Sequence, residues 1–142
     1  MNNNTRLGLI YMINFIDLFA GAGGLSEGFV SNGYNAVAHV EMNSEACNTL
    51  KTRACYYYLK NNDRINKYYD YLKGKIDREE LYNSVPDTVT KSVLNETMSK
   101  KSLESLFTKI ELLMSINNRN NLDAVNDQNS TIPTLLNAGR SG

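Results

Sequence analysis

A glycine-rich turn near the start of the chain constrains the fold more than any other feature. Residues 13–19, Ile-Asn-Phe-Ile-Asp-Leu-Phe, form a short apolar run, and residues 20–24, Ala-Gly-Ala-Gly-Gly, follow directly. A short apolar run bounded by glycines is typical of a buried parallel strand. After the turn, Leu25, Phe29 and Val30 recur at helical spacing. The pattern therefore predicts a strand, a tight turn and a helix.

A second strand and a second helix are expected directly afterwards. Gly33 stands where a helix C-cap glycine belongs. Residues 35–42, Asn-Ala-Val-Ala-His-Val-Glu-Met, are typical of a strand that ends in an acid, and Asn43 is a favourable N-cap for the helix that follows. An α/β doubly wound sheet begins with this order of elements.

The turn is suited to binding a nucleotide-like cofactor. Glycines let the backbone approach a ligand closely, and the helix N-terminus offers unpaired N–H groups and the positive end of a dipole. An acid at the tip of the second strand accepts hydrogen bonds from ribose hydroxyls. Gly21 and Glu41 are spaced as this geometry requires, and Asp17 is placed to orient the turn or to counter a positive charge.

Two classes of cofactor fit this layout. The dinucleotide fingerprint is G-x-G-x-x-G, and here Gly21 and Gly23 fit it whereas Ser26 takes the place of the third glycine. S-adenosylmethionine has no phosphate but has a carboxylate, an ammonium group, a sulfonium and a ribose, which suit a turn of small residues better. An NAD-dependent oxidoreductase is therefore the less favoured alternative.

Two segments resemble motifs of the DNA cytosine-5 methyltransferases. Residues 15–29, Phe-Ile-Asp-Leu-Phe-Ala-Gly-Ala-Gly-Gly-Leu-Ser-Glu-Gly-Phe, resemble the first motif of that family, and residues 41–43, Glu-Met-Asn, resemble the second. The resemblance is good over residues 13–55, weak over 56–120 and faint at 122–125. It implies an α/β, Rossmann-like S-adenosylmethionine-dependent methyltransferase fold. This fold would be incomplete, with its first strands and helices followed by a helical insertion.

The resemblance also implies which residues bind S-adenosylmethionine. Glu41 would bind the ribose hydroxyls, and Met42 would pack on the adenine face. The other residues implied to form the pocket are Phe19, Ala20, Gly21, Gly23, Gly24 and Leu25. The family also has an acid that contacts the adenine amino group, and the candidates for it are all unconvincing: Asp63, Asp70 and Asp77.

The nucleophile of the family has no counterpart in this sequence. The family attacks cytosine C6 with the cysteine of a Pro-Cys-Gln loop, on a base that is flipped out of the duplex. Pro86 and Pro133 are not followed by cysteine, and Cys47 and Cys55 are ordinary helix residues. We therefore expect no catalytic residue here.

The chain is accordingly interpreted as the N-terminal part of a restriction–modification methyltransferase. Its expected partners are double-stranded DNA for the intact enzyme and a complementing chain that carries the catalytic part. The alternative is a truncated, non-catalytic protein that at most binds cofactor or a partner.

The chain divides into five expected parts. They are a leader (1–12), the start of the S-adenosylmethionine-binding domain (13–55), a mostly helical insertion (56–120), a further strand (121–125) and a disordered tail (126–142). Within the insertion, Asp77 followed by Glu80 marks a helix start. One further helix is expected from an apolar stripe: Leu103, Leu106, Phe107, Ile110, Leu113 and Met114.

Charge and composition narrow the function classes. Lys plus Arg and Asp plus Glu both number 15, so the formal net charge is zero, whereas a domain that grips nucleic acid by itself is usually basic. Two cysteines without a secretion signal suit a reducing cytoplasm, and with a single histidine, His39, they make a metal site unexpected. No apolar run approaches the roughly 20 residues that span a bilayer.

Overall fold

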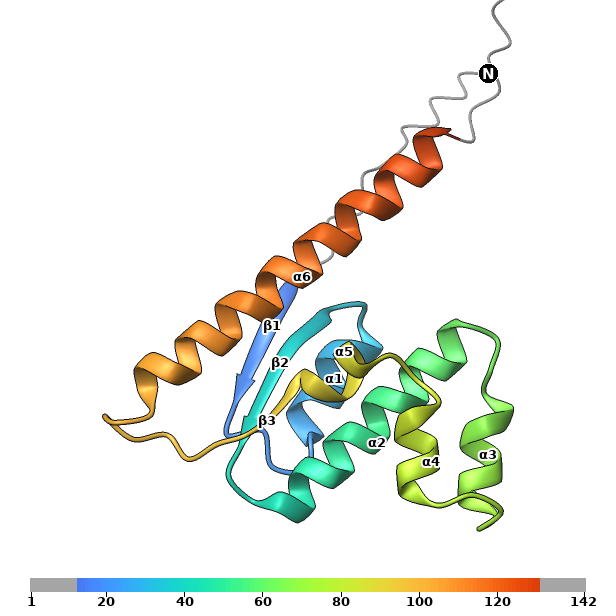
Figure 1. Ribbon diagram of the computed structural model, residues 1–142, viewed down its shortest axis with the longest axis horizontal. Helices are drawn as coiled ribbons and strands as arrows, with labels where there is room; N and C mark the ends of the chain where they lie inside the picture. The colour runs from blue at the N-terminus through green and yellow to red at the C-terminus, as the bar shows by residue number, and fades with distance from the viewer. Residues whose placement is uncertain (1–12, 131–142) are drawn as a thin grey trace, which may run out of the picture.

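Three parallel strands form the centre of the protein. The computed structural model describes residues 13–130, in which β1 (Asn14–Leu18), β2 (Asn35–Glu41) and β3 (Val93–Asn95) lie in the order β1-β2-β3 (Figure 1). Both strand pairs are parallel. The predicted α/β class and the first two predicted strands are confirmed. The sheet is compatible with a methyltransferase fold, while the Rossmann-like cofactor-binding arrangement remains a prediction.

Helices cover both faces of this sheet. The helices of the described residues are α1 (Gly24–Ser31), α2 (Ser44–Asn61), α3 (Asn66–Leu72), α4 (Arg78–Asn83), α5 (Asp87–Lys91) and α6 (Leu103–Ser130). The long helix α6 lies on one face, and α1 and α2 lie on the other (Figure 1). One helix, α1, connects β1 to β2, and four helices, α2 to α5, connect β2 to β3. Helical crossovers of this kind allow neighbouring strands to run parallel.

Local sequence signals fix several helix ends. The Asn43 side chain caps α2 by accepting a hydrogen bond from the Ala46 N–H at 2.9 Å. Asp77 and Glu80 form a reciprocal capping box at the start of α4. Gly33, just beyond α1, has a φ of +84°, a left-handed conformation that glycine adopts without strain. All three helix-end predictions are confirmed.

The predicted apolar stripe lies on α6 and is only partly buried. Leu106 and Ile110 pack on Ala38 and Val40 of β2 and form one core cluster. Phe107, by contrast, is 55% exposed, because only one face of the helix packs on the sheet and the residue next to Leu106 points away from that face. The contact fixes α6 on one face of the sheet.

The tyrosine-rich region has a small core of its own. Cys55, Leu59, Leu81 and Val85 are buried together where α2, α4 and α5 meet. The side chains packed around this cluster are mostly aromatic: Tyr58, Tyr68, Tyr71, Ile76, Tyr82 and Val89. The segment at 56–120 is therefore mostly helical, as expected, but it also contains β3, which the sequence analysis missed.

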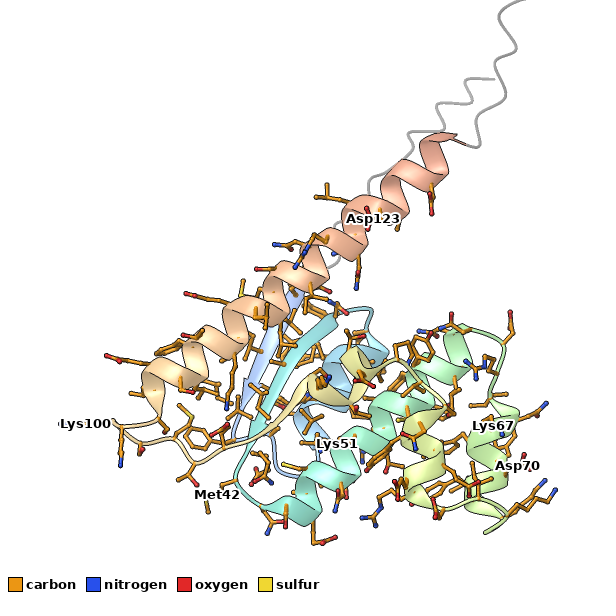
Figure 2. All side chains as sticks on the ribbon, in the orientation of Figure 1. Met42, Lys51, Lys67, Asp70, Lys100 and Asp123 are labelled. Atoms are coloured by element: carbon orange, nitrogen blue, oxygen red, sulfur yellow. The ribbon has the colours of Figure 1, made fainter. Side chains whose placement is uncertain are left out.

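The strand predicted at 121–125 is wrong. These residues continue α6, which also includes residues 126–130 of the expected disordered tail. Periodicity alone does not distinguish so short an apolar run from a helix, and no glycine or proline interrupts the chain between 103 and 130. Figure 2 shows Asp123 on the part of α6 that projects beyond the sheet. The expected leader (1–12) and the rest of the tail (131–142) lie outside the described residues.

Candidate functional site

The glycine turn joins β1 to α1 through three left-handed residues. Phe19, Gly21 and Gly23 have φ values of +63°, +54° and +86°. The Gly23 N–H donates to the Ala20 carbonyl at 2.9 Å, and the Ala20 N–H donates to Val40 of β2 at 3.1 Å. A positive φ at a bulky residue such as Phe19 is strained, and such strain persists where the surroundings impose it, often at ligand sites.

The acid at the end of β2 is bound to the turn. Glu41 Oε2 accepts a hydrogen bond from the Gly21 N–H at 2.7 Å, and Glu41 Oε1 accepts one from the Asn43 N–H at 2.8 Å. Backbone hydrogen bonds, first from Asn43 and then from Gly21, lower the pKa of Glu41. The carboxylate is therefore ionised at neutral pH, and each oxygen keeps a lone pair for a further donor such as a ribose hydroxyl.

Large apolar side chains lie exposed beside the turn and the end of β2. Phe19 is 75% exposed, Leu25 68% and Met42 69%. Figure 2 shows Met42 at the turn between β2 and α2. A Cβ added at Gly21 or Gly24 would meet no atom within 4 Å. Exposed apolar groups next to open backbone suit a partly apolar ligand.

A buried polar pair anchors the turn from below. Asp17 on β1 accepts a hydrogen bond from the Ser26 hydroxyl on α1, and both residues are buried. The pair supports the orienting role predicted for Asp17. His39 lies on β2 opposite Asp17, and burial lowers its pKa although the Asp17 charge opposes this shift. His39 is therefore neutral at pH 7.

The end of β3 adds an acid that the sequence analysis did not identify. The Glu96 N–H donates to the Glu41 carbonyl at 3.0 Å, and the Glu96 carboxylate pairs with Lys109 of α6. Glu96 therefore follows directly from the strand end beside Glu41. The one available signal was the apolar pair Val93-Leu94 shortly before an acid, and β3 is too short for periodicity to reveal.

The three weaker acid candidates lie away from this edge of the sheet. Asp77 caps α4, and Asp70 pairs with Lys75. Asp63 lies in the turn between α2 and α3, and Figure 2 shows Asp70 on α3, far from the sheet. None of these three acids therefore lies beside Glu41.

Neither cysteine is placed as a nucleophile. The Cys47 thiol donates to the Glu41 carbonyl and accepts from the Asn95 side-chain amide, both at 3.3 Å. Burial raises the pKa of the Cys55 thiol to about 11. Within residues 13–130, no three His, Cys, Asp or Glu side chains gather into a metal site. The helices of the same residues contain no candidate for a membrane-spanning segment.

A groove of about 680 Å³ lies away from the predicted cofactor residues. Residues of α1, α2, β2, α5 and α6 line it, and of the predicted set only Gly23 does so. The turn, Glu41 and Met42 instead form an open surface at the carboxyl ends of the strands, where ligands of α/β sheets bind.

Comparisons with known proteins agree with the motifs. The family model of the C-5 cytosine-specific DNA methylases matches residues 13–86, just over half of the chain. The type II methyltransferase M.Bpa9945I of Bacillus paralicheniformis is 50% identical over 58 residues, which are 41% of this chain and 13% of that protein. A candidate type II methyltransferase of Methanocaldococcus jannaschii, M.MjaORF1200P, is 45% identical over 38 residues, which are 27% of this chain and 10% of that protein.

These matches set the scale of the relationship. The chain covers only about a tenth of the length of either curated relative. No solved structure matches the chain significantly. The family match nevertheless contains the whole glycine turn, the acid at the end of β2 and α2. The chain therefore belongs to the C-5 cytosine-specific DNA methylase family.

Proposed function

We propose that this chain binds S-adenosylmethionine at the carboxyl ends of β1 and β2. One observation carries the proposal, namely the hydrogen bond between the Gly21 N–H and Glu41, which joins the turn and the acid into one site. Family membership supports the choice of cofactor over NAD, and so does Ser26, which is buried and bonded to Asp17 where a dinucleotide fingerprint has glycine.

Each part of the site has a role in this proposal. The turn, with Ala20, Gly21, Gly23 and Gly24, receives the methionine tail, and Glu41 binds the ribose hydroxyls. The adenine is flanked by exposed apolar side chains: Phe19, Leu25 and Met42. In this proposal Glu96, which follows the neighbouring strand, would accept a hydrogen bond from the adenine amino group. When bound, the cofactor supplies an electrophilic methyl group on its sulfonium.

The intact enzyme, in this proposal, methylates C5 of cytosine in double-stranded DNA within a restriction–modification system. The names of the two relatives, both given as type II methyltransferases, support that setting. The two free, buried thiols suit a reducing cytoplasm. The chain alone does not methylate DNA, because no proline in its sequence precedes a cysteine.

A complementing polypeptide would pair with the free edge of β1. Within residues 13–130, β1 is an edge strand of the sheet, and Ile13, Ile16 and Leu18 beside that edge are 59%, 36% and 42% exposed. An open strand edge with apolar side chains is a template for pairing with another strand.

Calorimetric titration with S-adenosylhomocysteine tests the cofactor assignment. We expect binding at sub-millimolar concentration and no competition from NAD. Displacement of the ligand by NAD would favour the oxidoreductase alternative, and no heat at millimolar ligand would leave only shared ancestry.

A methyl-transfer assay tests the proposed inactivity. Labelled cofactor and cytosine-containing duplex DNA should give no product with this chain alone. Product formation that disappears in a Cys47→Ser or Cys55→Ser variant would overturn the proposal.

A further inference from the structure

Two side chains of α2 hold the first turn of α1. Arg53 Nη1 donates to Glu27 Oε2 at 3.1 Å, and the Tyr57 hydroxyl donates to Glu27 Oε1. Arg53 and Tyr57 are one helical turn apart on α2, so they engage the two oxygens of one carboxylate from the same face. We refer to Glu27, Arg53 and Tyr57 as the Glu27 clamp.

The clamp extends to the glycine turn itself. The Gly23 carbonyl accepts the Glu27 N–H at 2.9 Å and lies 3.5 Å from Arg53 Nη1. A Cβ on Gly23 would come within 2.7 Å of Leu50 Cδ2, which is also on α2. Gly23, the left-handed N-cap residue of α1, is therefore held against α2.

Stability alone is a weak explanation for the clamp. The side chains of Arg53 and Glu27 are 41% and 45% exposed, and ion pairs at that exposure contribute little to folding. Burial, followed by the hydrogen bond to Glu27, raises the pKa of Tyr57 to about 12. Its hydroxyl therefore remains protonated, and able to donate, throughout the neutral range.

We propose that Arg53 and Tyr57 are positioning residues that act through Glu27 to set the glycine turn, and thereby control affinity for the methionine tail of the cofactor. This inference rests on the proposed function. Glu41 is held by the end of β2 and by two backbone N–H groups, those of Asn43 and Gly21. The clamp contacts Gly23 directly, so it reaches Glu41 only through the hydrogen bond from Gly21. The adenosine part of the site therefore depends less on the clamp than the methionine part does.

Two ligands distinguish binding at the adenosine part of the site from binding at the methionine part. S-adenosylhomocysteine carries the amino-acid tail, whereas 5′-methylthioadenosine retains the adenosine and the sulfur without it. We would titrate the 142-residue chain and its Tyr57→Phe variant with both. The expected result is a five- to tenfold higher Kd for S-adenosylhomocysteine in the variant, with the Kd for 5′-methylthioadenosine within twofold of the parent value.

A neighbouring tyrosine gives a matched control. Tyr56 is on the same helix, its ring packs on Tyr57 and Tyr68, and it lies outside the clamp. Tyr56→Phe should leave both affinities unchanged. Glu27→Gln is a second test variant, which keeps the shape of the side chain but removes the charge that pairs with Arg53. It should show the same ligand-specific loss, with thermal midpoints recorded to verify that each variant is folded.

The inference is overturned if folded Tyr57→Phe and Glu27→Gln variants bind both ligands as the parent does, or lose both equally. An equal loss would mean that the clamp only supports the fold. A parent chain that binds neither ligand would instead overturn the proposed function, and this inference with it.

Discussion

Replacing Gly23 by alanine tests how tightly the turn is held against α2. Gly23 has a φ of +86°, and the new Cβ would lie 2.7 Å from Leu50 Cδ2. Leu50 is 3% exposed and belongs to a core cluster with Ala20, Cys47 and Val93, so it has little room to move. The left-handed backbone costs alanine about 1–2 kcal/mol, and overpacking a core costs about 1–3 kcal/mol.

We therefore expect Gly23→Ala to lower the free energy of unfolding by about 3 kcal/mol, measured by urea denaturation followed by circular dichroism. Two glycines of the same turn are controls. Gly21 has a φ of +54° and open space around it, so Gly21→Ala should cost only the backbone strain, about 1 kcal/mol. Gly24 has neither a positive φ nor a close neighbour, so Gly24→Ala should be neutral or slightly stabilising.

The effects of substitutions at Gly23 and Leu50 on stability should be coupled. Leu50→Ala removes the atom that the new Cβ would strike, so the double variant should lose less stability than the two single variants together, by at least about 0.5 kcal/mol. Additive losses, or a Gly24→Ala variant as unstable as Gly23→Ala, would refute the described packing of the turn.

Three further predictions follow from burial and charge. Hydrogen bonds lower the pKa of Glu41 in the folded state from its ordinary value of 4.5, so its contribution to stability is present above that pH and is lost as the pH falls below it. The Glu41→Gln variant should therefore show a smaller decline in the urea midpoint between neutral pH and pH 3. An unchanged profile would contradict this. Leu106 is 1% exposed, so Leu106→Ala should lower the free energy of unfolding by about 2–5 kcal/mol. Leu122 is 63% exposed, so Leu122→Ala should change it by no more than about 0.5 kcal/mol. Equal urea midpoints for the two variants would show that α6 packs differently. Cys55, with a pKa of about 11 and a buried thiol, should resist a thiol reagent at pH 8 until urea unfolds the chain, and rapid labelling of the folded protein would show that the site opens.

Local chemistry made the first half of the fold predictable. The strand at 13–19, the turn and the strand at 35–42 were marked by glycines and by apolar runs of the right length. Caps at Asn43 and Asp77 were visible because their geometry needs only neighbouring residues. The choice of cofactor came from the family resemblance. The contact between Gly21 and Glu41 is the one that their spacing in the sequence predicts.

The features that were missed depend on distant partners. β3 has three residues and is held by pairing with His39 to Glu41, more than 50 positions earlier in the chain. The run at 122–125 suits either a strand or a helix, and it is helical because nothing local ends α6 before it. The Glu27 clamp links residues 26 and 30 positions apart, which no periodicity reveals.

In the proposed function, the turn, Glu41 and Met42 bind S-adenosylmethionine together. Titrating the ¹⁵N-labelled chain with S-adenosylhomocysteine while recording backbone amide shifts tests it most directly. The largest shifts are expected at Gly21, Gly23, Gly24 and Met42, and no shift is expected at Gly74, which lies beyond α3. Shifts confined to the groove around Ala36 and Val89, or none at saturating ligand, would contradict it.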